Sequence, residues 1–127
     1  MIEFKAVTKI FGTFKVLDNL NLELPRGRIT VILGKSGEGE SVTIKHIMGL
    51  LKPTSGRVIV DGEDITDWEE PQLREYRKQF GMLFQMAALF DSMSVGENVM
   101  FPLREHFSMT EAEMLAKAET VLEEVGL

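Results

Sequence analysis

The sequence contains no cysteine, no long hydrophobic run and no excess of basic residues. Without cysteine the chain can form neither disulfide bonds nor a cysteine-ligated zinc site, which favours a reducing, intracellular location. No apolar stretch approaches the roughly 20 residues that a membrane-spanning helix needs. The N-terminus also lacks the basic and apolar regions of a secretion signal. We therefore expect the chain to be cytoplasmic.

The charge balance limits the kind of partner that the chain can have. Its 127 residues include 14 lysines and arginines against 20 acidic residues, and the formal net charge is −6. Such a balance argues against a broad basic surface for nucleic acid, so any phosphate must be held by a local group of atoms. The hydrophobic fraction of 44% is that of an ordinary globular chain with one domain at most.

Hydrophobic patterns predict strands of two kinds. Partly alternating patterns predict strands at 2–8 and 15–24, and an antiparallel pair at 57–60 and 63–65 around a tight turn. Two continuous apolar runs, at 29–33 and 80–84, are typical of strands buried in a parallel sheet. The acidic side chains near the turn do not have the spacing of a calcium loop, so we interpret them as a solvated turn. These are Asp61, Glu63, Asp64 and Asp67.

Helical periodicity predicts four further elements. We expect helices at about 40–51 and 69–79, then a short helix from Val95 that Pro102 interrupts, and a final helix. Ser108 and Glu111 have the spacing of a capping box for that last helix. Its buried stripe is predicted to be Met114, Ala118, Val121 and Val125. The proline-containing loop at 102–109 is a weak candidate for a domain boundary.

The motif that carries chemistry lies at 34–41, between the run at 29–33 and the next helix. It reads Gly-Lys-Ser-Gly-Glu-Gly-Glu-Ser. Its three glycines permit left-handed or closely approaching backbone, so the N–H groups of about 36–41 can turn toward one phosphate. The helix N-terminus adds its dipole, and the Ser41 hydroxyl stands where such a loop supplies a magnesium ligand. The pattern favours a nucleotide phosphate site over a glycine-rich turn without a ligand.

Glu40 departs from this motif, which has lysine after its last glycine. Two unit charges 4 Å apart interact by about 4 kcal/mol at an effective dielectric constant of about 20. Glutamate therefore replaces an attraction to phosphate with a repulsion and should weaken binding by orders of magnitude. The alternative is that Glu40 is a substitution in an otherwise normal loop, since lysine and glutamate codons differ by one base.

From about Phe4 to Leu127 the chain resembles the first half of the ATP-binding cassette, the ATP-binding subunit of ABC transporters. The resemblance rests on residues 34–41, on 51–56 with Asp61-Gly62, and on 84–90 with the segment 95–99. The amino-acid sequences of these segments are most similar to those of the bacterial branch that moves phospholipids between membranes and is linked to organic-solvent tolerance. It implies the α/β fold of a P-loop NTPase over residues 1–127, incomplete, with an N-terminal antiparallel β part and a partial parallel core sheet.

The resemblance also implies ATP and Mg²⁺ as cofactors and assigns roles to individual residues. Phe11 matches the aromatic residue that stacks on adenine, and Val16 would pack on the same base; core packing is the alternative for both. Gln85 matches the catalytic glutamine that contacts magnesium and the attacking water, so Ser41 and Gln85 would be metal ligands. The phosphate-binding residues would be Gly34, Ser36, Gly37, Glu38, Gly39, Glu40, Ser41 and Val42.

The family's signature loop, its acidic magnesium-holding strand and its switch histidine do not appear before Leu127. We interpret His46 and His106 as packing or exposed side chains, and we expect the runs at 29–33 and 80–84 to lack strand neighbours. The implied partners are the membrane subunits of an ABC transporter and a second ATP-binding subunit, on the inner face of the bacterial inner membrane, with no nucleic acid. We expect this chain to be deficient in hydrolysis.

Two other functions remain open at this point. The chain could be a non-hydrolysing interaction fragment or regulator that docks on transporter subunits, which Glu40 favours. It could also be a nucleotide kinase or GTP-binding switch that shares the phosphate loop. The latter does not predict Gln85 and the segment after it.

Overall fold

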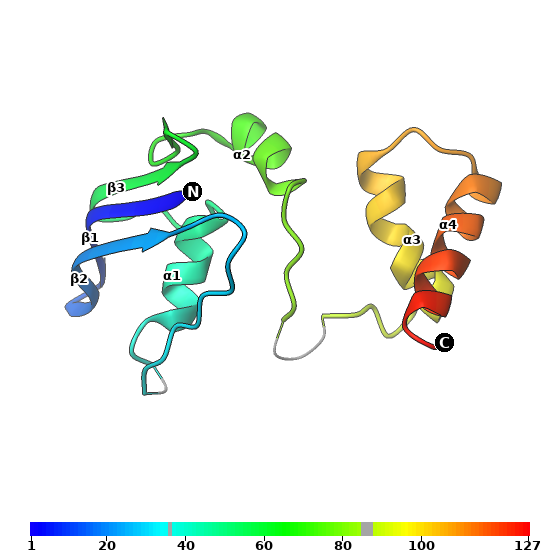
Figure 1. Cartoon of the computed structure of the whole chain (residues 1–127), viewed down its shortest axis with the longest axis horizontal. Coiled ribbons are helices and arrows are strands. Elements are labelled where there is room, and N and C mark those ends of the chain that lie inside the picture. The colour runs from blue at the N-terminus through cyan, green and yellow to red at the C-terminus, as the bar shows by residue number, and fades with distance from the viewer. Residues whose placement is uncertain (36, 85–87) are drawn as a thin grey trace. The chain divides into compact units, whose positions relative to one another are not determined.

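The computed structural model describes residues 1–35, 37–84 and 88–127. The chain divides into two compact units, Met1–Phe80 and Gly81–Leu127, each of which has its own packing (Figure 1). The boundary predicted at 102–109 is therefore wrong. That loop lies within the second unit, where it joins two helices that pack against each other.

An antiparallel sheet forms one side of the N-terminal unit (Figure 1). Its strand order is β2-β1-β3-β4, in which every neighbouring pair is antiparallel. The strands are β1 (Ile2–Phe11), β2 (Phe14–Leu24), β3 (Ser55–Val60) and β4 (Glu63–Asp64). Asp61 and Gly62 have φ angles of 51° and 88°, as a type I′ hairpin turn requires. The predicted antiparallel part is thus confirmed, with longer strands.

Two short helices complete the N-terminal unit: α1 (Glu40–Ile47) and α2 (Glu70–Arg77). Both confirm predicted helices, although α1 ends four residues earlier than expected. The Tyr76 hydroxyl of α2 donates a hydrogen bond to the Ile47 carbonyl at 2.6 Å, so α2 holds the C-terminal end of α1. The buried core contains residues of the sheet, of α2 and of the segment between them: Phe4, Val7, Leu17, Val58, Ile65, Leu73 and Tyr76.

The apolar runs at 29–33 and 80–84 do not form the predicted strands. Ile29, Val31 and Leu33 are 96%, 71% and 88% exposed. A strand requires a neighbour that satisfies its backbone N–H and C=O groups, and the described residues place no strand beside either run. This agrees with the expectation that both runs would lack sheet neighbours.

The C-terminal unit contains two helices that pack on each other, α3 (Val95–His106) and α4 (Glu111–Glu124). Its small core consists of Met100, Met114 and Ala118. The predicted stripe of α4 is therefore correct for Met114 and Ala118 and wrong for Val121 and Val125, which are exposed.

Two local predictions about these helices are also wrong. Pro102 lies inside α3 without ending it, because the ring removes one backbone hydrogen bond while the turns on either side keep theirs. The capping box of α4 is formed by Thr110 and Glu113, not by Ser108 and Glu111. The Thr110 N–H donates to the Glu113 carboxylate at 2.7 Å. The helix therefore begins at a pair with the predicted spacing, but two residues later in the sequence.

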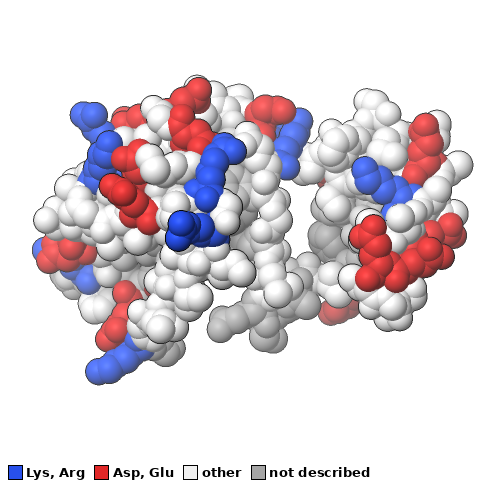
Figure 2. All heavy atoms as spheres, viewed as in Figure 1, with Lys and Arg blue, Asp and Glu red and all other residues white. Residues whose placement is uncertain are grey.

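The two units differ sharply in charge. Residues 1–80 include 12 acidic and 12 basic residues, whereas residues 81–127 include eight acidic and two basic residues. Figure 2 shows acidic side chains gathered on the visible face of the C-terminal unit, while both signs are mixed on the N-terminal unit. The whole negative balance of the chain therefore belongs to the C-terminal unit. In the described ranges, no helix is long and apolar enough to cross a bilayer.

His46 on α1 is 1% exposed, which confirms its interpretation as a packing residue. Its Nδ1 lies 2.7 Å from the Val42 carbonyl oxygen, and its Nε2 is buried without a hydrogen-bond partner among the described residues. Burial lowers the pKa of His46 below the ordinary value of 6.5, because it disfavours the charged imidazolium; the Val42 carbonyl opposes this shift.

We expect acid to destabilise the N-terminal unit through His46. In the unfolded chain this imidazole takes up a proton near pH 6.5, whereas the folded chain resists protonation until the pH is lower. The stability that neutral His46 contributes is therefore complete above pH 6.5 and is lost as the pH falls through the window below it, by up to about 1.4 kcal/mol per pH unit. Urea unfolding followed by Trp68 fluorescence measures this loss.

The matched variants are His46→Gln and His106→Gln, which remove a buried and an exposed imidazole respectively. His46→Gln should flatten the dependence of the unfolding free energy on pH below pH 6.5. His106→Gln should leave that dependence unchanged. If the pH dependence of His46→Gln equals that of the unmodified chain, His46 does not carry the effect.

Candidate functional site

The glycine loop at 34–41 leads directly into α1. Gly37 and Gly39 have φ angles of 90° and 111°, which confirms the left-handed backbone that the sequence predicted at these two positions. Gly39 is the N-cap of α1, and no described side chain forms a capping hydrogen bond with the first N–H groups of the helix. These amides and the positive end of the helix dipole are therefore free to interact with an anion.

Neighbouring elements hold the end of the loop in place. Thr43, which is buried, donates from both its backbone N–H and its Oγ1 to the Gly39 carbonyl, at 2.8 and 3.0 Å. A Cβ added at Gly39 would lie 2.9 Å from Leu17 Cδ2 and 3.2 Å from Val16 Cγ1. Strand β2 thus packs directly under the loop, and only glycine fits at position 39.

Thr43 is a site residue that the sequence reasoning missed. The signal was available, since a threonine one helical turn after an N-cap can donate to the carbonyl four residues before it. Val16 was predicted to contact a base, and in this structure its side chain lies against Gly39.

Two carboxylates of the loop converge on Gly34. A Cβ added at Gly34 would lie 2.7 Å from Glu40 Oε1 and 3.5 Å from Glu38 Oε2. The Lys35 N–H donates a hydrogen bond to Glu38 Oε2 at 2.9 Å. Glu38 and Glu40 are thus turned toward the start of the loop, where a phosphate-binding loop would require positive charge.

The loop borders a cavity of about 320 Å³. Its apolar wall comes from β2 and from the exposed run that precedes the loop, and its polar side comes from the loop itself. The lining residues include Leu17, Leu20, Leu22, Thr30, Val31, Ile32, Leu33, Gly34, Glu38, Gly39, Glu40 and Thr43. The loop therefore faces a concave space.

Three other predicted site residues lie in different environments. Phe11 ends β1, opposite Phe14, and is 44% exposed, with Lys9 Nζ 5.1 Å from its ring centroid. Ser41 is exposed on the first turn of α1. Val42 packs partly on the core.

Ser36 and Gln85 lie outside the described residues, so their predicted roles in phosphate and metal binding have no structural description.

The backbone of the loop fits a phosphate group, but the side chain of Glu40 does not. Gly37, Gly39 and the uncapped N–H groups of α1 provide the concave set of donors that a phosphate needs. Glu40 contributes a negative charge beside Gly34 instead of the usual cation. For magnesium, the Ser41 hydroxyl is an exposed oxygen of the type that magnesium prefers, and the described ranges contain no cluster of three or more acidic, histidine or cysteine residues that could hold a metal.

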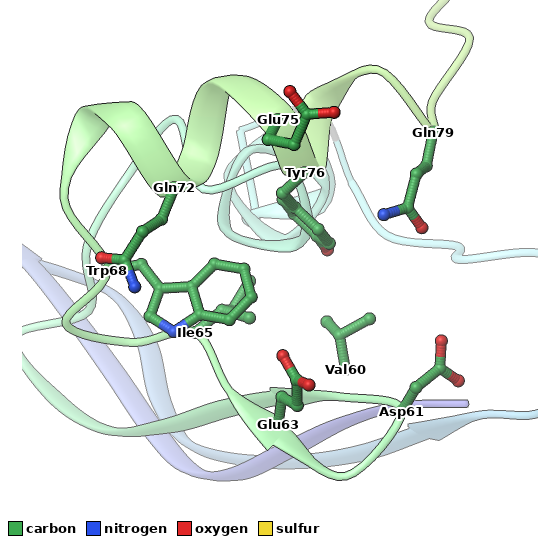
Figure 3. Close-up of a pocket in the computed structure, with 9 residues that line it drawn as sticks. All are labelled: Val60, Asp61, Glu63, Ile65, Trp68, Gln72, Glu75, Tyr76 and Gln79. Carbon is green, nitrogen blue, oxygen red and sulfur yellow. The ribbon is translucent and has the colours of Figure 1, made fainter.

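A second cavity, of about 360 Å³, lies between the β3–β4 hairpin and α2 (Figure 3). Its polar and aromatic groups are largely engaged in the fold. Trp68 packs edge-on against Tyr76, with ring centroids 5.8 Å apart. The carboxylate of Asp61 binds the Arg26 guanidinium and the N-terminal ammonium, which hold the pKa of Asp61 well below its usual range. These contacts are consistent with the interpretation of the acidic segment as a turn without a metal.

Comparisons with known proteins place this geometry in a family. The ABC transporter family matches residues 17–127. The probable ribonucleotide transport ATP-binding protein mkl of Mycobacterium leprae is 43% identical over 126 residues, which is 99% of this chain and 36% of that protein. The intermembrane phospholipid transport ATP-binding protein MlaF of Haemophilus influenzae is 42% identical over 127 residues, which is 100% of this chain and 48% of that protein.

The solved structures agree with the sequence relatives. A dimeric ATP-binding cassette in a post-hydrolysis state, bound to ADP and Pi, matches with a TM-score of 0.85 and 32% identity, over 97% of this chain and 56% of that one. The chain thus spans between about a third and a half of the curated relatives' length, and the predicted α/β cassette fold is confirmed. The predicted partial parallel core sheet is not formed by the described residues, whose strands are all antiparallel. Because the family match covers most of the sequence and a solved cassette superposes on nearly all of it, the chain belongs to the ABC transporter family.

Proposed function

We propose that the chain is the N-terminal part of an ATP-binding subunit of an ABC transporter, in which ATP binding and hydrolysis are coupled to membrane subunits. The observation that carries the proposal is the start of α1. There, two glycines have left-handed backbone, α1 begins without a side-chain cap, and Gly39 and Glu40 line a concave space. This arrangement supports binding of a nucleotide phosphate tail.

Each predicted residue has a role in this proposal. Phe11 and Val16 contact the adenine, and the phosphates are bound by Gly34, Ser36, Gly37, Glu38, Gly39, Glu40, Ser41 and Val42, mainly through their backbone. Ser41 and Gln85 hold Mg²⁺, which would neutralise phosphate charge when bound. In the intact subunit Gln85 also orients the attacking water.

We propose a lipid as the transported substrate. The MlaF proteins of Haemophilus influenzae and Escherichia coli, named for intermembrane phospholipid transport, are 42% and 37% identical to the whole chain. The relative named for ribonucleotide transport supports a different substrate at similar identity. The proposed partners are transporter membrane subunits and a second ATP-binding subunit, and the proposed location is the inner face of the bacterial inner membrane.

A second candidate function is a non-hydrolysing fragment or regulator that docks on transporter subunits. The position of Glu40 favours it, because the carboxylate lies against Gly34 in the proposed phosphate site. Both candidates predict that these 127 residues do not hydrolyse ATP.

We expect the purified chain to bind Mg-ATP weakly, with a dissociation constant of about 1 mM or higher, and to release no measurable phosphate. The reason is the repulsion between Glu40 and the phosphates, which the backbone amides offset only in part. Amide chemical shifts in an NMR titration report binding, and a phosphate-release assay reports turnover.

The control is Ser41→Ala, which removes the proposed magnesium ligand from an exposed position and should leave the fold intact. In this variant the shift changes caused by Mg-ATP should become smaller and independent of magnesium. Turnover by the unmodified chain would contradict its predicted deficiency, and identical titrations of both proteins would contradict the role of Ser41.

A further inference from the structure

The proposed phosphate loop contains a second carboxylate that the nucleotide-binding role does not use. We infer that the Glu38 side chain is a built-in competing anion: held on the Lys35 N–H beside Gly34, it limits the affinity of the loop for phosphate separately from Glu40. This inference rests on the proposed function of the loop. It concerns the side chain of Glu38; the backbone N–H of the same residue, predicted to turn toward a phosphate, donates instead to the Lys35 carbonyl.

Two hydrogen bonds fix this carboxylate in the loop. The Lys35 N–H donates to Glu38 Oε2 at 2.9 Å, and the Glu38 N–H donates to the Lys35 carbonyl at 2.9 Å. The two bonds close a turn, and they hold a charged side chain that would otherwise extend into solvent. A hydrogen bond from a backbone N–H to a carboxylate is stronger than one between neutral groups. The carboxylate is therefore part of the loop's structure.

The charge of Glu38 lies close to Gly34, at the edge of the cavity. Glu38 Oε2 would lie 3.5 Å from a Cβ added at Gly34, and Glu38 lines the cavity that the loop borders. Much of the wall opposite is apolar, formed by side chains such as Leu17, Leu20 and Leu22. Glu38 is itself exposed, so its charge is screened by salt, and a phosphate entering this space meets a repulsion that is largest at low ionic strength.

Glu38 and Glu40 contribute separate charges to the loop. Glu40 is the first residue of α1, whereas Glu38 belongs to the turn before the N-cap. The two carboxylates reach Gly34 from different points of the chain, so neutralising one leaves the other in place. Residues 34–41 contain one lysine and two glutamates. Removing either negative charge should thus favour anion binding, and removing both should favour it further.

The experiment uses the full 127-residue chain with Glu40→Gln as the background, because glutamine at position 40 introduces no cation that could pair with Glu38. Glu38→Gln is then added, which removes the charge and keeps an oxygen that can accept from the Lys35 N–H. The matched control is Glu119→Gln, which removes the same charge from an exposed position on α4. Mg-ATP and inorganic pyrophosphate are titrated separately, and amide shifts are followed by NMR at low and at high salt.

We expect Glu38→Gln to tighten binding of both ligands roughly tenfold at low salt, and the gain should shrink at high salt because charge repulsion is screened. A change in loop shape alone would not depend on salt in this way. The Lys35 amide shift in the absence of ligand tests whether the turn is retained.

Equal affinities for Glu38→Gln and the Glu119→Gln control would overturn the inference while leaving the proposed function intact, provided that the background variant binds. A gain in affinity that is identical at both salt concentrations would overturn it as well. If no variant binds either ligand, and Glu40→Lys does not bind either, the proposed function fails and the inference fails with it.

Discussion

Replacing Glu40 with lysine should raise the affinity of the chain for Mg-ATP by about 100-fold or more. The substitution removes a carboxylate that lies against Gly34 and places an ammonium group in the same region. At 4 Å and an effective dielectric constant of about 20, each unit charge contributes about 4 kcal/mol to its interaction with a phosphate charge, and hydration offsets part of that. Isothermal titration calorimetry measures the change.

Glu40→Gln is the matched control, because it removes the repulsion without adding an attraction. Its affinity should lie between those of the unmodified chain and Glu40→Lys. An unchanged affinity in Glu40→Lys would mean that the loop does not bind phosphate through this part of its structure. The phosphate-release assay should stay negative for all three proteins, since the change restores a binding charge only.

The largest expected loss of stability comes from Gly56→Ala in β3. A Cβ at this position would lie 2.3 Å from the Ala6 carbonyl oxygen and 2.6 Å from Val7 Cα, and Gly56 has a φ angle of 89°. The contacted atoms are backbone of the adjacent strand, so no side-chain rotation relieves the clash. We expect a loss of about 3 kcal/mol or more in the free energy of unfolding, measured by urea unfolding with Trp68 fluorescence.

Gly62→Ala separates the clash from the strain of the backbone. Gly62 has nearly the same φ angle, 88°, but an added Cβ there would meet no atom within 4 Å. It should therefore cost only about 1 kcal/mol, the penalty of alanine in a left-handed conformation. Equal losses in the two variants would show that close packing against β1 is not the cause.

Local patterns predicted the antiparallel part of the fold because its signals are short-range. The Asp61-Gly62 turn, the alternation in β1 and the glycines of the loop each specify their own conformation. The close approach of Gly56 to β1 was not predictable in this way. It depends on an irregularity between Lys5 and Thr8 in the pairing with β3, which no pattern within either strand reveals.

The errors concern features that depend on neighbours distant in the sequence. The run at 29–33 has the composition of a buried strand, but a strand forms only where a partner strand lies beside it. Ser108 and Thr110 each have a glutamate three residues later, so local spacing does not distinguish them as N-caps. The helix α4 begins after Thr110, and Met114 then packs on α3. At the candidate site, the sequence identified the loop and the anomalous Glu40, whereas the inward orientation of Glu38 and the support from Thr43 required coordinates.

The exposed run from Ile29 to Leu33 has a consequence for handling the protein at high concentration. It consists of β-branched and leucine side chains with no charge, proline or glycine to interrupt it. Such a segment can align with identical segments of other molecules and form intermolecular cross-β contacts. The chain is therefore prone to aggregate as its concentration rises, and the repulsion between its acidic helical pairs, weakened by added salt, opposes that assembly.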